Sequence, residues 1–178
     1  MKTENNQMMA NRYPPYRIGW FLFLFVAIYG MFEFLYFKIP DSFLTDVIYY
    51  HGLVSPCVSI INFLGAGEDA VANRNMLSSY GISLEVVRGC DGAGTMFLLA
   101  AAVITFSASF KDKILGLSIG ITLLFVINLL RIVGLYFVMR YQSAWFTPIH
   151  TYFAPTLIII ISCLFFAIWA QYATKKNS

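Results

Sequence analysis

The sequence predicts an all-α integral membrane protein with about four transmembrane helices and a small extracytoplasmic insertion made of one helix and a hairpin. Two observations lead to this prediction. The 178 residues are 59% hydrophobic and only 12% charged, whereas soluble domains carry about a quarter charged residues. Several stretches also approach or exceed the roughly 18 to 20 apolar residues that cross a bilayer. We expect residues 1–178 to form a single multi-pass domain.

The first expected span covers about residues 18–38. It is an apolar run rich in Phe and Leu, broken only by Glu33, and it follows a polar N-terminal segment. A signal peptide would have a shorter apolar region followed by a cleavage motif of small residues. Since this run is longer and has no such motif after it, we expect a span that is retained.

Residues 40–89 are expected to form an insertion on the outer side. Residues 43–65 are moderately apolar but are interrupted by Asp46, His51 and Pro56, which favours an amphipathic helix on the membrane surface. A fifth span here is the alternative, and it would disrupt the charge pattern described below.

Two short strands are predicted after this helix. Residues 71–77 and 82–87 flank the turn Ser78-Ser79-Tyr80-Gly81, and residues 82–86 alternate apolar and polar as a half-buried strand does. The hairpin leads the chain directly to Cys90.

The other expected spans cover about residues 93–110, 114–139 and 151–170. Between the first two of these stands Lys111-Asp112-Lys113, a segment so short that it predicts a tight turn between antiparallel helices.

The charges predict an orientation. With a cytoplasmic N-terminus, the inner segments hold seven basic residues (Lys2, Arg12, Arg17, Lys111, Lys113, Lys175 and Lys176), and most carboxylates lie outside. This follows the positive-inside rule, and we expect both termini to be cytoplasmic at the cytoplasmic (inner) membrane. No basic patch suits a nucleic acid. Three cysteines and two histidines without metal-ligand spacing predict no metal, no cofactor and no disulfide framework.

Three reactive side chains converge in this topology. Cys90 precedes one span, His150 opens another, and Arg131 lies about 25 Å along a third, so all three face the outer side. A helix N-terminus beside Cys90 favours its thiolate. A guanidinium at the depth of Arg131 costs at least about 2.5 kcal/mol and therefore indicates a specific role or a partner. Asn128 shares its helical face, whereas Cys57 and Cys163 are expected to be inert.

The pattern of Cys90 with Gly92, Asn128 with Arg131, and then His150 resembles the exosortase/archaeosortase family. The resemblance implies a multi-pass membrane cysteine transpeptidase that acts on membrane-anchored proteins with a C-terminal sorting tail. Cys90, Arg131 and His150 would be catalytic, with Asn128 and Gly92 supporting them. Cys90 would form a thioester, His150 would act as base and acid, and Arg131 would stabilise the oxyanion.

Two other functions remain open from the sequence. A non-catalytic membrane partner or assembly subunit would pair Arg131 with Glu33 or Asp91 for structural reasons. A small transporter is less favoured, because no span shows the Gly/Pro break or midplane charge of a substrate pathway.

Overall fold

The structure is a computed structural model that describes residues 15–65 and 67–176. The predicted basic residues Lys2 and Arg12 lie outside the described residues. The chain forms, in order, α2 (Pro15–Lys38), α3 (Asp41–Phe43), η1 (Leu44–Val54), α4 (Ser55–Leu64), β1 (Val71–Asn73), β2 (Met76–Ser79), β3 (Ile82–Glu85), α5 (Ala93–Thr105), α6 (Phe110–Tyr141), η2 (Ser143–Trp145), α7 (Phe146–Pro148), η3 (Ile149–Phe153) and α8 (Ala154–Lys176).

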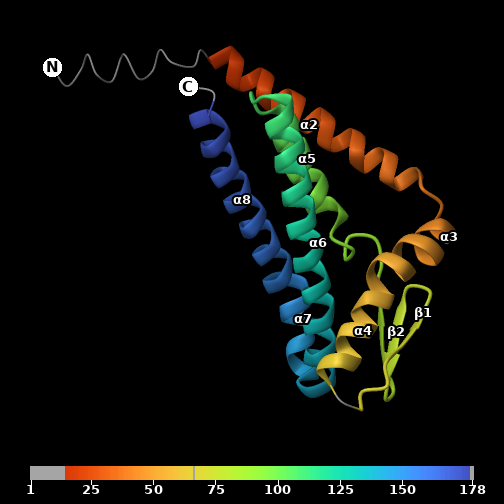
Figure 1. Ribbon diagram of the computed structural model, residues 1–178. Coiled ribbons are helices and arrows are strands. Elements are labelled where there is room, and N and C mark those ends of the chain that lie inside the picture. The colour runs from red at the N-terminus through yellow and green to blue at the C-terminus, as the bar shows by residue number, and fades with distance from the viewer. Residues whose placement is uncertain (1–14, 66, 177–178) are drawn as a thin grey trace.

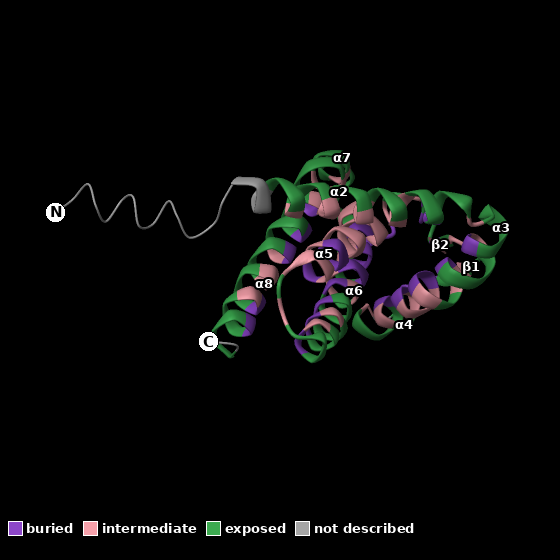
Figure 2. Cartoon of the chain, turned by 90° about the horizontal axis from the view of Figure 1, so that it is seen from above, coloured by how far each residue is buried: buried purple, intermediate pink, exposed green. Residues whose placement is uncertain are grey.

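The predicted all-α membrane fold is confirmed. Among the described residues, four helical stretches are long and apolar enough to cross a membrane, namely 19–38, 41–64, 110–141 and 143–176, and α5 is a shorter apolar helix. The outward surfaces of α2 and α8 carry exposed large apolar side chains such as Trp20, Phe23 and Ile168, which suits contact with lipid (Figure 2).

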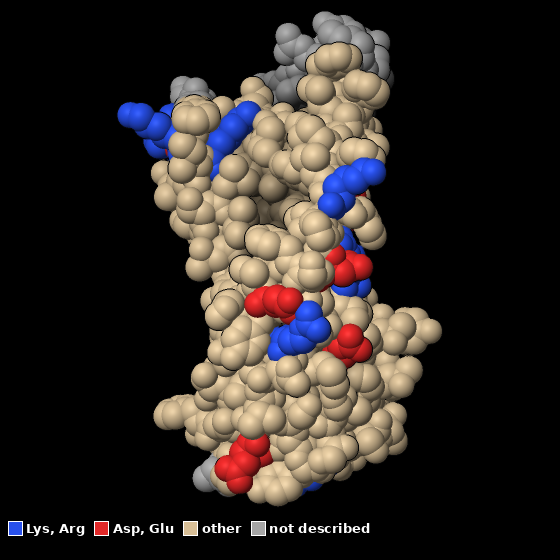
Figure 3. All heavy atoms as spheres, turned by 90° about the vertical axis from the view of Figure 1, so that its right-hand side faces the viewer, with Lys and Arg blue, Asp and Glu red and all other residues tan. Residues whose placement is uncertain are grey.

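The start of α2 and the sheet lie at opposite ends of the molecule. In Figure 1, α6 and α8 run side by side, α5 packs on α6, and α2 packs on α5. The start of α2 and the end of α8 lie at one end, while α4 and the strands lie at the other. On the face shown in Figure 3, the acidic side chains lie in the middle and lower parts, toward the sheet.

The expected hairpin contains a third strand. One strand was expected over residues 71–77, but Arg74, with a φ of +54°, turns the chain, and this segment forms β1 and β2. The predicted turn at Tyr80 and Gly81 is present, and both residues have positive φ. The sheet is antiparallel with the order β1-β2-β3, so β3 is an edge strand.

The connection between α5 and α6 lies earlier than expected. Because α5 ends at Thr105 and α6 begins at Phe110, the predicted turn residues 111–113 form the first turn of α6. The Ser109 hydroxyl accepts a hydrogen bond from the backbone N–H of Asp112 at 3.3 Å, as an N-cap does. This local cap favours the helix over the turn that the charged run suggested.

Asp112 also ties α6 to α8. Its buried carboxylate lies 2.7 Å from Nζ of Lys176, and its carbonyl oxygen accepts a 3.0 Å hydrogen bond from Nε1 of Trp169. Gly116, one turn further along α6, leaves room for the Trp169 ring. These contacts hold α6 and α8 together at the end away from the sheet.

Two apolar cores lie along α6. One core lies under the sheet and includes Val54, Leu77 and Tyr136, with η1, α4 and the last part of α6 around it. The other lies between α5, α6 and α8 and includes Leu99 and Leu124. The 32 residues of α6 extend over about 48 Å, which exceeds a hydrocarbon core of about 30 Å. One helix therefore belongs to the membrane bundle and to the sheet layer.

The helical stretch 41–64 packs on β1, β2 and α6. This packing favours a helix that belongs to the outer insertion. Its position relative to the bilayer stays a prediction.

Candidate active site

A thiol and an imidazole meet between two distant segments. Cys90 lies in the loop between β3 and α5, and its Sγ is 3.3 Å from Nε2 of His150 in η3. The His150 ring stacks on Phe146 with the ring centroids 5.4 Å apart and the planes 11° apart. This stacking holds the plane of the imidazole ring beside the thiol. The pair is thus within the hydrogen-bonding reach that an activated cysteine needs.

Gly92 allows α6 to approach the loop of residues 86–92 that carries Cys90, here called the cysteine loop. It has a φ of +82°, and a Cβ at this position would lie 2.8 Å from Cγ of Asn128. The Asn128 amide donates a 2.8 Å hydrogen bond to the carbonyl oxygen of Asp91. The glycine is therefore needed for its conformation and for its lack of a side chain. The two motifs that the sequence analysis paired are in direct contact.

Arg131 lies one helical turn beyond Asn128, beside the same loop. Its Nη1 is 3.4 Å from the carbonyl oxygen of Cys90. Its Nε and the Asn128 Oδ1 are buried, and neither has a hydrogen-bond partner among the residues described. Since nearly all buried polar atoms in native proteins are paired, the open donor of Arg131, beside the loop that carries Cys90, suits a bound ligand.

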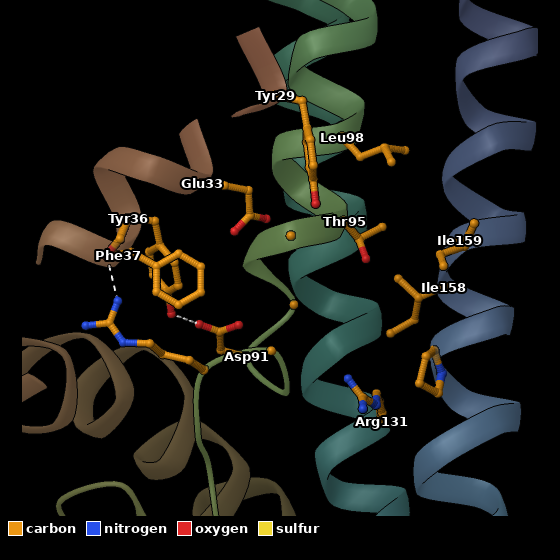
Figure 4. A pocket seen from close by; sticks show the side chains of 15 residues that line it. Tyr29, Glu33, Tyr36, Phe37, Asp91, Thr95, Leu98, Arg131, Ile158 and Ile159 are labelled. Carbon is orange, nitrogen blue, oxygen red and sulfur yellow. Dashed lines mark hydrogen bonds between the residues drawn. The ribbon is translucent and has the colours of Figure 1, made fainter. Parts of the chain in front are cut away.

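The structural alternative for Arg131 required a salt bridge to Glu33 or Asp91. Within the described part of the chain, no salt bridge joins Arg131 to Glu33 or Asp91. Asp91 is engaged elsewhere. Its buried carboxylate accepts hydrogen bonds from the hydroxyls of Tyr36 and Tyr49, the second at 3.1 Å, as Figure 4 shows for Tyr36.

Arg88 holds the other side of the cysteine loop. Its guanidinium donates to the backbone carbonyls of Tyr36 and Ile39, at 2.7 and 2.5 Å, and pairs with Asp41 at 2.8 Å. These carbonyls belong to the end of α2 and the residue that follows it, where carbonyl groups lack helical partners. Arg88 and Asp91 therefore fix the loop on α2 from both sides of Cys90.

Sequence reasoning missed these supporting residues. Arg88 and Asp91 lie within two residues of Cys90, and this proximity in sequence is the only signal that the sequence offers for them. Tyr36 and Tyr49 belong to no motif.

Two pockets adjoin the site, and Arg131 lines both. The first, of about 410 Å³, lies between α2, α5 and α8 and includes Glu33 and Thr95 (Figure 4). The second, of about 290 Å³, contains Cys90 and His150 and extends along β3. Arg131 thus lies between the two pockets. A peptide that extends from one pocket into the other would pass both Arg131 and the Cys90 thiol.

The other two cysteines are elsewhere. Cys57 is fully buried, and its Sγ is 3.7 Å from the carbonyl oxygen of Leu129. Cys163 is exposed on α8, on a helix that is apolar enough to face lipid. These positions suit the inert role that was expected for both.

The family model of the transmembrane exosortase matches residues 15–168. Searches of curated proteins and of solved structures gave no match. The match covers most of the chain, including every residue of the site described above. The chain belongs to the transmembrane exosortase family, which confirms the resemblance seen in the sequence. This membership suggests a role as a membrane transpeptidase.

Proposed function

We propose that this protein is a cysteine-dependent peptidase and transpeptidase that removes a C-terminal, membrane-anchoring sorting tail from other proteins. The observation that carries the proposal is the 3.3 Å separation of Cys90 Sγ and His150 Nε2. The buried, unpartnered Nε of Arg131 beside this pair supports it. Cys90, His150 and Arg131 are the proposed catalytic residues, and Asn128 and Gly92 are positioning residues.

The first half-reaction forms a thioester. His150 Nε2 takes the proton from the Cys90 thiol, and the sulfur attacks the scissile carbonyl carbon. Arg131 stabilises the negative charge that develops on the carbonyl oxygen, because its Nε–H has no competing partner in the described structure. The carbon–nitrogen bond then breaks, and His150 returns the proton to the leaving amine of the tail.

The second half-reaction transfers the acyl group. An amine or hydroxyl of an acceptor attacks the thioester while His150 takes its proton. The carbon–sulfur bond breaks, and the Cys90 thiolate recovers the proton from His150. Transfer to an acceptor on the cell surface anchors the protein there, and transfer to water releases it.

The first pocket suits the tail of the substrate. It lies between α2 and α8, whose outward surfaces are apolar, and Arg131 is one of the residues that line it. A helix in the lipid can therefore bring its outer end to the site without crossing the bundle.

We place the site on the extracytoplasmic side of the cytoplasmic membrane, with both termini inside. The support is the charge distribution: Lys111, Lys113, Lys175 and Lys176 lie where α6 begins and α8 ends, whereas Asp91 lies at the site. Short cytoplasmic segments are enriched in basic residues. We also propose that residues 1–178 form one multi-pass domain with 40–89 as its outer insertion.

The decisive experiment compares the three cysteines in cells. Cys90→Ala, Cys57→Ala and Cys163→Ala proteins replace the wild-type chain, and mass spectrometry measures which membrane proteins retain their C-terminal tails. We expect tails to accumulate only with Cys90→Ala, because only Cys90 has an imidazole beside it. Full tail removal by the Cys90→Ala protein would refute the proposal.

A second experiment tests the thiol and its location. A membrane-impermeant alkylating reagent is applied to intact spheroplasts over a range of pH, with His150→Ala for comparison. We expect faster labelling of Cys90 in the wild-type protein than in the variant, because His150 lies within reach of the thiol proton. Equal, slow labelling of the two proteins would indicate an ordinary thiol.

A further inference from the structure

The strand β3 has one open edge. The sheet order places β2 on one side of β3 and no strand on the other. The Val86 N–H donates a 2.8 Å hydrogen bond to the Asn75 carbonyl oxygen, so the backbone groups of Val86 point toward β2 and its turn. Because backbone groups alternate along an antiparallel strand, the N–H and C=O groups of Ser83 and Glu85 point away from the sheet. In the described part of the chain, these groups have no backbone partner.

The open edge faces the pocket that contains the thiol. Residues 83–87 line one side of the second pocket. Ile132, Leu135 and Met139 of α6 line it as well, and Cys90 and His150 complete it. A row of unpaired backbone groups, an apolar wall and a candidate nucleophile thus share one cavity of about 290 Å³.

We propose that the substrate binds as an added strand on the open edge of β3. The segment that precedes the scissile bond would pair with Ser83 and Glu85 and place its last carbonyl beside Cys90. This is β-augmentation, in which main-chain hydrogen bonds supply affinity. The inference rests on the proposed function and adds the way in which the substrate is recognised.

The direction of the added strand follows from the fold. β3 runs toward Cys90, and the tail of the substrate must continue from the thiol into the bilayer. The substrate segment therefore runs parallel to β3. Residues 83–87 extend over about 13 Å, which corresponds to about four substrate residues.

This mode predicts the class of substrate. Since the backbone is what β3 recognises, the site accepts extended peptides of varied sequence. Selection comes from the side chains that alternate toward Leu135 and Met139, and these favour apolar groups.

The test uses a defined probe and the full chain in lipid nanodiscs. The probe is acetyl-Val-Val-Ala ending in a vinyl sulfone. The alkene carbon next to the Ala residue, which is β to the sulfonyl group, bonds to the Cys90 sulfur, and the thiol proton ends on the alkene carbon next to the sulfonyl group. Three further probes each carry one N-methylated backbone amide. Iodoacetamide, which has no peptide backbone, reports the reactivity of the thiol itself.

We expect N-methylation to slow labelling about tenfold at the amides that face β3, because each loses one hydrogen bond. The amides that alternate with these should be unaffected. Equal labelling by all four peptides, with rapid labelling by iodoacetamide, would overturn the inference and leave the proposed function intact. Slow iodoacetamide labelling that does not change in His150→Ala would instead contradict the proposed function.

Variants locate the effect on β3. In Ser83→Pro and Glu85→Pro, the ring removes an N–H that points to the open edge while the bonds to β2 remain. We expect each to slow the peptide probe about tenfold and to leave iodoacetamide labelling unchanged. Ser83→Ala keeps the N–H and should behave as wild type. Ala72→Pro makes the matched change on β1, at the opposite edge of the sheet, and should have no effect.

Hydrogen exchange gives a readout that needs no substitution. After labelling with the unmethylated peptide, the backbone amides of Ser83 and Glu85 should exchange at least about tenfold more slowly than after labelling with iodoacetamide. The amide of Ala72 should not change. Equal exchange at Ser83 and Glu85 in the two adducts would overturn the inference.

Discussion

Gly92 and Asn128 are in such close contact that a single added methyl group would separate them. A Cβ on Gly92 would lie 2.8 Å from Asn128 Cγ and 3.0 Å from its Oδ1. Asn128 holds the Asp91 carbonyl, and the neighbouring carbonyl of Cys90 faces Arg131. This contact therefore sets how far the thiol lies from the guanidinium, and it explains why a glycine follows two positions after the cysteine.

Gly92→Ala should lower the rate of tail removal about a hundredfold, the cost of displacing a reacting group by about 1 Å. Gly89→Ala is the matched control. It also substitutes a glycine of positive φ, +85°, but its Cβ would meet nothing within 4 Å. We expect Gly89→Ala to retain more activity. The measurement is the turnover of a tailed membrane protein, and equal losses in the two variants would mean that backbone strain alone is responsible.

Arg131→Ala should lower turnover about a hundredfold to a thousandfold, as removal of an oxyanion donor does. Folded protein and Cys90 alkylation should persist, because the described structure shows no ion pair that depends on Arg131. Arg131→Lys keeps the charge but lacks the Nε donor, and should restore little activity. Loss of folded protein in Arg131→Ala would favour a structural role in a membrane assembly instead.

Gly116→Ala should destabilise the bundle by about 1 to 3 kcal/mol, the usual cost of overpacking. A Cβ there would lie 2.4 Å from Nε1 of Trp169, so the indole that bonds to Asp112 must move. Gly134→Ala on the same helix is the control, since its Cβ would meet nothing within 4 Å. Thermal unfolding in lipid nanodiscs should show a lower midpoint for Gly116→Ala only. A similar decrease in both variants would contradict this explanation.

Glu68 links the loop before β1 to the end of α6. Its buried carboxylate accepts hydrogen bonds from the hydroxyls of Tyr136, at 2.5 Å, and Tyr141, at 2.7 Å, and it lies 3.5 Å from Nε of Arg140. The Tyr136 bond, the Tyr141 bond and the charge of Arg140 hold the pKa of Glu68 below its ordinary value of 4.5.

A depressed carboxyl pKa stabilises the fold only while the group is ionised. Its contribution is complete above the unfolded value of 4.5 and is lost as the pH falls through the lower folded value. Glu68→Gln should therefore unfold at a lower denaturant concentration than wild type at neutral pH. The gap between the two proteins should narrow as the pH is lowered below about 4.5. A gap that stays constant would show that the carboxylate charge does not matter.

The sequence was sufficient to predict the membrane fold and that Cys90 and His150 lie at one level of the bundle, but not that they are within hydrogen-bonding distance. The fold follows from hydropathy, and the common level follows from the depth at which each residue enters its span. The anchoring of Asp91 by Tyr36 and Tyr49 could not be predicted, because these residues lie 55 and 42 positions away and recur in no motif. The start of α6 was misplaced because the charged run concealed the cap at Ser109.

The unbroken course of α6 fixes the distance between the start of this helix and the candidate site. One rigid rod passes from the bilayer bundle into the sheet layer and carries Arg131 about 32 Å from its first residue. In the proposed orientation, α6 would hold the thiol at one height above the lipid. On the proposed function, a tail would be cut where its chain reaches that height, so the thickness of the bilayer and the length of the tail would help to determine which peptide bond is broken.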